Sequence, residues 1–118
     1  MTCPRGTVGV LLVNWNTARL TAECVDSLRA GTRVPDSIMI VDNGSAPDDL
    51  NQLRALPGVE LLPQPENLGF TGANNLGLSE LLARGAEYVW ILNNDTVVGK
   101  KCLEHLLAAL DGQPAVGA

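Results

Sequence analysis

The sequence contains no apolar run long enough to cross a lipid bilayer. Its longest apolar stretch, from Val8 to Val13, is far shorter than the ~20 residues that a membrane-spanning helix requires. No positively charged segment followed by an apolar one opens the chain, as it would in a secretory leader. The sequence therefore predicts no transmembrane segment and a cytoplasmic location.

Residues that build metal clusters or disulfide frameworks are scarce. The three cysteines, Cys3, Cys24 and Cys102, are widely spaced and form no CxxC pair, so we expect all of them to be reduced and mostly to serve packing. The single histidine, His105, falls near the leucine face of the last predicted helix. We expect it to be a boundary residue rather than a catalytic base.

Basic residues are in short supply, with 8 Lys and Arg against 13 Asp and Glu and a net charge of −5. A nucleic-acid-binding surface would need a basic stripe, so no nucleic-acid partner is expected. A nucleotide ligand remains compatible with this balance, because a bound metal ion neutralises phosphates. The glycine patterns GxGxxG after the first strand and GxxxxGKS or GxxxxGKT are both missing, which argues against dinucleotide-binding and P-loop sites.

Short apolar runs alternate with segments of helical period along the whole chain. This alternation is typical of an α/β domain with a mostly parallel sheet of about four strands and flanking helices. The predicted strands cover residues 7–13, 37–41, 59–62 and 88–92. The predicted helices begin near residue 16 or 17, near 45 and at 73, and the last one carries Leu103, Leu106, Leu107 and Leu110 on one face. We expect one domain, 1–118, whose final residues 115–118 open another strand.

Polar residues gather where the predicted strands end. In open parallel sheets, ligands bind beyond the carboxyl ends of the strands, and all these polar clusters fall at that edge. The sequence therefore predicts a ligand site there. The clusters are residues 14–16, 42–45, 66–75 and 93–95.

Asp95 is the best single candidate for a metal ligand. Mg²⁺ and Mn²⁺ prefer oxygen ligands and often take only one or two carboxylates, with phosphates and water completing the shell. The alternative is that Asp95 caps the last helix. Asp42 directly follows an apolar run and could accept hydrogen bonds from a base or from ribose hydroxyls.

The remaining polar positions allow two interpretations each. Trp15 follows the first strand, where an aromatic ring can stack on a base, although simple packing explains it equally well. Asn14, Asn16 and Asn43 alone are better explained as turn and cap residues. In the stretch 66–77, glycines could let the backbone approach a diphosphate, next to a helix N-terminus that favours negative charge.

Four ordered motifs together resemble the family 2 glycosyltransferases, and in particular their rhamnosyltransferase-like branch. These are inverting enzymes with the Rossmann-like GT-A fold, which binds a nucleotide sugar. The motifs are LLVNWN (11–16), IMIVDNGS (38–45), ENLGFTGANNLGL (66–78) and YVWILNNDTVV (88–98). They span nearly the whole chain, which makes the resemblance specific.

The resemblance implies a nucleoside-diphosphate sugar as donor and a divalent metal, Mg²⁺ or Mn²⁺, on its diphosphate. Carried over by position, Trp15 would stack near the base and Asp42 would bond the base or ribose. Asp95 would be the surviving acid of the metal motif, in which residue 93 and residue 94 are asparagines. The other implied donor-binding residues are Asn14, Asn16, Asn43, Gly69, Gly72, Asn75 and Asn94.

The resemblance also implies what this chain lacks. We expect the acceptor-binding half and the general base to lie downstream of Ala118, so that no catalytic residue is assigned here. The acceptor would be a glycan or a lipid-linked glycan in cell-wall polysaccharide biosynthesis, handled at the inner face of the membrane. The truncated chain would bind donor and metal weakly and transfer no sugar. Apolar surface left uncovered could make it oligomeric.

Two other classes of protein remain as alternatives. A response-regulator receiver domain has a similar length and alternation, and Asp42 and Asp95 would both end strands. Such domains need an acidic pair after the first strand, where this chain has Asn14 and Asn16. A non-catalytic nucleotide-sugar-binding domain with the same fold is the second alternative, since fold alone does not decide function.

Overall fold

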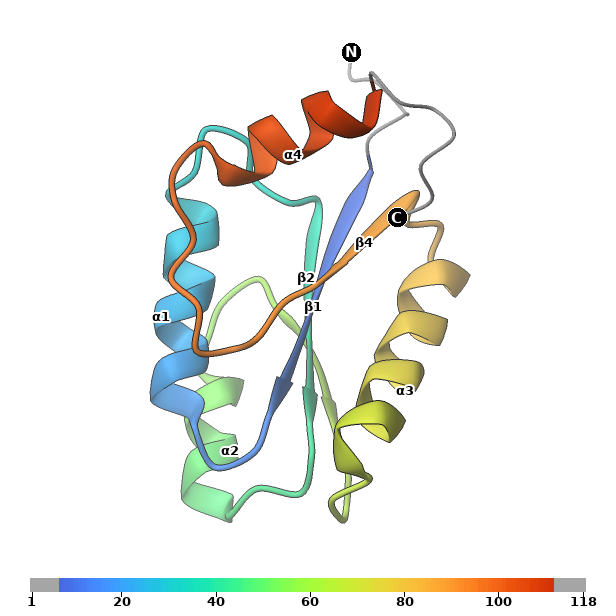
Figure 1. Ribbon diagram of the computed structural model, residues 1–118. Helices are drawn as coiled ribbons and strands as arrows, with labels where there is room; N and C mark the ends of the chain where they lie inside the picture. Colours follow the sequence, from blue (N-terminus) through green and yellow to red (C-terminus); the bar gives the residue numbers. More distant parts are fainter. Residues whose placement is uncertain (1–6, 112–118) are drawn as a thin grey trace.

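The structure is a computed structural model and describes residues 7–111 of the chain. Strands and helices alternate along it (Figure 1). The strands are β1 (Val8–Asn14), β2 (Ser37–Asp42), β3 (Glu60–Pro63) and β4 (Tyr88–Ile91). The helices are α1 (Ala18–Arg29), α2 (Pro47–Arg54), α3 (Gly69–Ala83) and α4 (Cys102–Asp111). Within this part of the chain, no helix is long and apolar enough to pass through a membrane.

The four strands form one sheet in the order β3-β2-β1-β4, and every pair is parallel. This confirms the predicted α/β fold with a parallel sheet of about four strands. In the register of β1 and β2, Asn14 lies beside Asp42, and Asp42 lies beside Pro63 of β3. The carboxyl ends of the strands therefore meet at one edge, where the polar clusters were expected.

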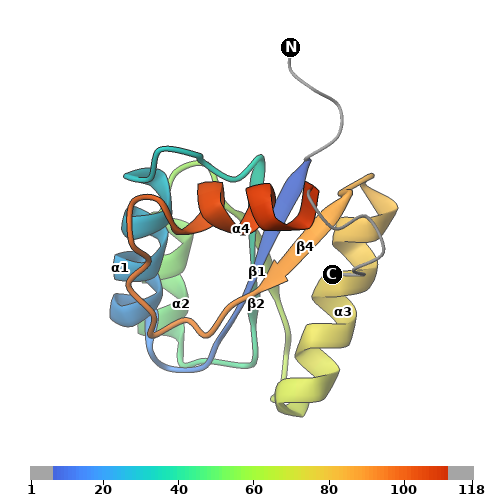
Figure 2. The same cartoon turned by 45° about the horizontal axis from the view of Figure 1, so that its top comes forward.

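Helices cover both faces of the sheet (Figure 1). Alternate residues of β1 serve the two layers: Val10 and Leu12 pack on the side of α1 and α2, while Leu11 packs under α3. The helix α4 lies across the amino-terminal part of β1 and β4 (Figure 2), where its leucines face Val8 and Trp90. The predicted leucine face of the last helix thus points to the sheet, and Trp90 packs against the core.

The start of α3 differs from the prediction. The helix begins at Gly69 rather than Ala73, so Gly69 and Gly72 belong to a helix and not to a loop, while Asn75 is helical as predicted. Glycine and asparagine have low helix propensity, which is why this stretch was predicted to be irregular. Packing overrides that propensity, because Ala73 and Gly77 are buried against the sheet.

Smaller differences occur elsewhere. The third strand was predicted at residues 59–62, and β3 instead includes Pro63 as its last residue, which is tolerated because β3 is an edge strand. Cys24 is buried as expected, but Cys102 is exposed and does not serve packing. The predicted strand at residues 115–118 lies outside the described residues, as does Cys3.

Candidate functional site

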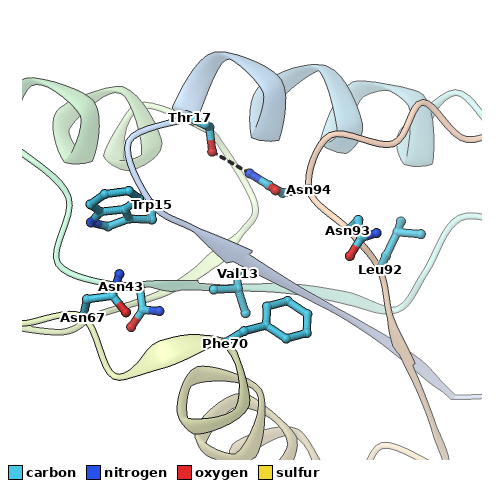
Figure 3. A pocket seen from close by; sticks show the side chains of 9 residues that line it. All are labelled: Val13, Trp15, Thr17, Asn43, Asn67, Phe70, Leu92, Asn93 and Asn94. Atoms are coloured by element: carbon cyan, nitrogen blue, oxygen red, sulfur yellow. Dashed lines mark hydrogen bonds between the residues drawn. The ribbon is translucent and has the colours of Figure 1, made fainter.

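A cavity of about 340 Å³ opens at the carboxyl edge of the sheet (Figure 3). Its walls come from the ends of β1 and β4, from the segment after β2, and from the first turn of α3. None of the lining side chains carries a formal charge. They are Val13, Trp15, Thr17, Asn43, Asn67, Phe70, Leu92, Asn93 and Asn94.

Two aromatic side chains stand exposed at this cavity. Trp15 is 54% exposed and Phe70 is 58% exposed. Trp15 follows the last residue of β1, and the chain turns sharply at Asn16, whose φ is 56°. An aromatic ring exposed beside polar amides offers a surface on which a planar ligand can stack.

A buried polar cluster lies behind the cavity and supports it. Asn14 and Asp42 are both 0% exposed, and the Asn14 amide nitrogen donates to Asp42 Oδ1 at 3.0 Å, to Asp49 Oδ2 at 2.9 Å and to Ser45 Oγ at 3.2 Å. Asp42 also accepts bonds from the hydroxyl and the backbone N–H of Ser45, at 2.6 and 3.0 Å. Buried polar groups are costly unless they are bonded in this way.

The same cluster reaches the loop after β4. The hydroxyls of Thr17 and Thr21 donate to Asn14 Oδ1 at 3.3 and 2.7 Å. The Asn94 amide nitrogen donates to Thr17 Oγ1 at 2.8 Å, a bond drawn in Figure 3, and to Thr21 Oγ1 at 2.9 Å. We call the five residues Asp42, Asn14, Thr17, Thr21 and Asn94 the polar network. It links the end of β2 to the loop that carries Asp95.

Asparagine side chains fasten the start of α3 to the site. Asn43 Oδ1 accepts the backbone N–H of Leu68 at 2.8 Å, and Asn43 Nδ2 donates to the Gly69 carbonyl at 3.2 Å. Asn67 Oδ1 accepts the N–H of Gly69 at 2.7 Å. These bonds satisfy donors that a helix N-terminus leaves open and hold Phe70 at the cavity wall.

The cavity brings together three of the predicted site residues, Trp15, Asn43 and Asn94. Asn14 and Asp42 are buried behind it, and Asn16 accepts the N–H of Ala46 at 2.9 Å. Gly69, Gly72, Asn75 and Asp95 do not line the cavity. Six other residues line the cavity: Val13, Thr17, Asn67, Phe70, Leu92 and Asn93. Asn67, Phe70 and Asn93 fall within the predicted polar clusters 66–75 and 93–95, although no role was assigned to them. Val13, Thr17 and Leu92 lie outside those clusters and were not predicted.

Asp95 lies in the loop between β4 and α4 and is exposed. Because α4 begins only at Cys102, Asp95 does not cap that helix, and this alternative is wrong. Within residues 7–111 there is no group of three or more His, Cys, Asp or Glu side chains that could hold a metal. One carboxylate next to the Asn93 amide fits an open cation site only if a ligand supplies further oxygens.

Cys24 is not poised for metal binding or nucleophilic attack. Burial, assisted by the negative charge of Asp95, raises the pKa of its thiol from 9.0 to about 11. A thiol with this pKa stays protonated at neutral pH, whereas the thiolate is the reactive and metal-binding form. Cys24 is therefore a packing residue of α1.

The raised pKa makes stability dependent on alkaline pH. The unfolded thiol ionises near pH 9 and the folded thiol near pH 11, so the unfolded state binds fewer protons between these values. We expect the free energy of unfolding to fall by about 2 kcal/mol from this group as pH rises from about 9 to 11. Urea unfolding of wild type and Cys24→Ala at both pH values isolates the contribution, and an equal loss in the two proteins would contradict it.

Comparison with known proteins agrees with this arrangement. Residues 10–118 match the family described as glycosyl transferase family 2. Galactofuranosyltransferase GlfT1 of Mycobacterium tuberculosis is 36% identical over 77 residues, which cover 63% of this chain and 25% of that protein. GlfT1 of Mycolicibacterium smegmatis is 30% identical over 93 residues, covering 75% of this chain and 30% of the relative. The chain thus spans about a third or less of these relatives.

Solved structures show the same fold. Mannosyltransferase PcManGT from Pyrobaculum calidifontis, in complex with GDP-Man and Mn²⁺, superimposes with a TM-score of 0.79 at 24% identity, covering 96% of this chain and 34% of that one. TarS of S. aureus superimposes with a TM-score of 0.76 at 19% identity, covering 90% of this chain and 20% of its own. The fold of a GT-A enzyme is therefore confirmed, and the receiver-domain alternative is not favoured. The ordered motifs, the parallel sheet and the match over residues 10–118 agree that the chain belongs to glycosyl transferase family 2.

Proposed function

We propose that this chain is the donor-binding part of an inverting glycosyltransferase, which transfers a sugar from a nucleoside-diphosphate sugar to an acceptor hydroxyl. The observation that carries the proposal is the cavity at the carboxyl edge of the sheet, with exposed Trp15 on one side and the loop of Asp95 on the other. The acceptor, a glycan or lipid-linked glycan, and the general base would belong to the rest of the enzyme. A cytoplasmic location stays a prediction.

Within this proposal, Trp15 stacks on the base, and exposed amide groups around it offer hydrogen bonds to base or ribose. Asn67 and Asn93 are exposed at the cavity and suit this role. Asn67 would do so through its NH₂ group, because its Oδ1 already accepts the N–H of Gly69. The predicted bond from Asp42 to the base or ribose would compete with Ser45, because Ser45 already donates twice to that carboxylate. Gly69, Gly72 and Asn75 would then act through the helix α3 that they help to build.

The uncharged lining implies how the diphosphate is held. No Lys, Arg or His lines the cavity, so the negative charge of a diphosphate finds no cationic side chain there. A divalent cation such as Mg²⁺ or Mn²⁺ would supply that charge and stabilise the departing diphosphate. Asp95 would hold the cation on the protein side, and phosphate oxygens would complete its shell.

The donor sugar divides the proposal into two branches. The sequence motifs resemble rhamnosyltransferases, whereas the named relatives are galactofuranosyltransferases. Both branches share a nucleoside-diphosphate sugar as donor and differ in which nucleotide and which sugar it carries. A panel of donors that includes dTDP-rhamnose, UDP-galactofuranose and GDP-mannose therefore tests the common function and separates the branches.

A thermal-shift panel with and without Mn²⁺ tests the proposed function. We expect at least one nucleotide sugar to raise the melting temperature, with a larger rise in Mn²⁺, and we expect Asp95→Ala to remove the Mn²⁺-dependent part. Trp15→Ala should weaken donor binding about tenfold or more without lowering the melting temperature of the free protein, since Trp15 is exposed. Trp15→Phe, which keeps an aromatic face, should retain most of the affinity.

Two outcomes would contradict the proposal. The first is a melting temperature that no donor changes, with or without Mn²⁺. The second is donor binding that Trp15→Ala and Asp95→Ala leave intact, which would put the ligand elsewhere. Multiple-turnover sugar transfer by the 118-residue chain would refute the narrower prediction that the acceptor-activating base lies outside it.

A further inference from the structure

The segment Asn93-Asn94-Asp95, which resembles the family's metal motif, carries one acid, Asp95. The hydrogen bonds of the polar network restrict which side chain can stand at position 94. They have a direction, because each group in the network is restricted to donating or accepting. That direction can be followed from the buried end of the network at Asp42 to its half-buried end at Asn94.

The orientation of Asn14 is determined by its acidic neighbours. Carboxylates accept hydrogen bonds and do not donate them when ionised. The side chain of Asn14 meets Asp42 Oδ1 at 3.0 Å and Asp49 Oδ2 at 2.9 Å, so its NH₂ group has to face them. Its carbonyl oxygen, Oδ1, is therefore turned towards Thr17 and Thr21.

The two threonine hydroxyls have their donor and acceptor roles fixed by Asn14. A hydroxyl has a single proton to donate, and Thr17 and Thr21 both direct theirs to Asn14 Oδ1. Their oxygens can then only accept from a further partner. That partner is Asn94 Nδ2, at 2.8 and 2.9 Å, and both of its protons are used.

We propose that Asn94 is a positioning residue, which must be a hydrogen-bond donor because it holds the β4–α4 loop on α1 and thereby fixes Asp95. This role concerns the cation site and therefore rests on the proposed function. Asn94 acts through the backbone of its neighbour and is not itself a ligand of the cation. An aspartate at position 94 would set a carboxylate against two hydroxyl oxygens that have no proton left for it.

The first test needs no ligand. We expect Asn94→Asp to lower the melting temperature by ~5 °C or more, because the bonds to Thr17 and Thr21 are lost and a charge is left without a donor. Asn93→Asp is the matched control. It adds the same charge one residue earlier at an exposed side chain, and its melting temperature should change by less than about 2 °C.

The second test measures the gain in donor affinity that Mn²⁺ causes, by calorimetric titration of a donor from the panel with and without the metal. Thr21→Val removes the hydroxyl of a residue that is fully buried and does not line the cavity. Partners that orient a metal ligand typically contribute about tenfold or more to metal affinity. We expect Thr21→Val and Asn94→Asp to reduce the Mn²⁺-dependent gain about tenfold. Thr21→Val, which lies outside the cavity lining, should change donor affinity without Mn²⁺ by less than about twofold.

Two further variants separate positioning from general stability. Thr21→Ser keeps the hydroxyl and should restore the Mn²⁺-dependent gain. Thr32→Val removes a hydroxyl that bonds Glu104 Oε1 of α4 at 2.6 Å and the Lys100 carbonyl, at the other end of the same loop, at 3.2 Å. It should leave the gain unchanged. Equal losses in Thr21→Val and Thr32→Val would reduce Thr21 to a merely structural role and overturn the proposal.

The opposite result for Asn94→Asp would also overturn it. If this variant keeps its melting temperature and binds Mn²⁺ more tightly, residue 94 faces the cation rather than the threonines. If wild type binds no donor under any condition, the proposed function fails. The melting temperatures of Asn94→Asp and Asn93→Asp then still decide whether the side chain of residue 94 has to be a hydrogen-bond donor.

Discussion

Replacing Asn14 by aspartate is expected to lower the free energy of unfolding by about 3–5 kcal/mol. The change removes the NH₂ group that serves Asp42, Asp49 and Ser45 and puts another carboxylate in a site that is 0% exposed. Like charges at hydrogen-bond distance, without a proton between them, repel strongly in a buried environment. Urea unfolding followed by circular dichroism measures the loss.

Asn16→Asp is the control for this prediction. Asn16 is exposed, and the structure gives its side chain one bond, in which Oδ1 accepts the N–H of Ala46 at 2.9 Å. Aspartate can accept the same bond and tolerates the positive φ of 56° at this position. We expect a change within about 0.5 kcal/mol. Similar losses at positions 14 and 16 would show that Asn14 does not have the role that its buried bonds indicate.

Replacing Gly77 by valine is expected to cost about 3 kcal/mol or more, or to prevent folding. Gly77 is buried where α3 packs on side chains of β1 and β2. A Cβ atom there would lie 2.2 Å from Leu11 Cδ1 and 3.0 Å from Val41 Cγ2. Leu11 and Val41 are both fully buried, so neither can move away without disturbing the core.

Two companion variants keep the Gly77 prediction measurable. Gly77→Ala should fold and still lose stability, despite the better helix propensity of alanine, because its single extra carbon meets Leu11. Gly99→Val adds the larger side chain where no atom lies within 4 Å of the new Cβ and should change stability little. A Gly77→Ala protein as stable as wild type would mean that α3 can move away from the sheet.

The fold was largely readable from the sequence. The apolar runs at residues 8–13 and 38–41 are near-continuous, as in strands buried on both faces, and each was predicted to within about a residue. The start of α3 was missed because it depends on distant partners. Asn43 accepts the N–H of Leu68, and Gly77 permits close packing on Leu11, and neither contact follows from local propensity.

The location of the candidate site could be predicted from the sequence, whereas the orientations of its side chains could not. Parallel strands end at one edge, so the positions of Trp15 and Asn94 followed from the topology. The topology did not predict that Asn14 would face inward and Trp15 outward, because a residue at a strand end can face either way. The roles of Thr17 and Thr21 in the site were not predicted. Thr17 was considered only as a possible helix start and Thr21 as an ordinary residue of an amphipathic helix, whereas both form bonds to Asn14 and Asn94 across the fold.

The strand order β3-β2-β1-β4 has a consequence for how the cavity can change. The chain moves outward in one direction from β1 to β3 and then returns to the other side of β1 for β4. Such a reversal is a topological switch point, where open sheets leave a crevice for ligands. Here α1 and α3 on its two sides cover opposite faces of the sheet (Figure 1). Substitutions in α3 can therefore change the side of the cavity that Phe70 forms. The opposite side, formed by Trp15 and Thr17, does not depend on α3 for its position.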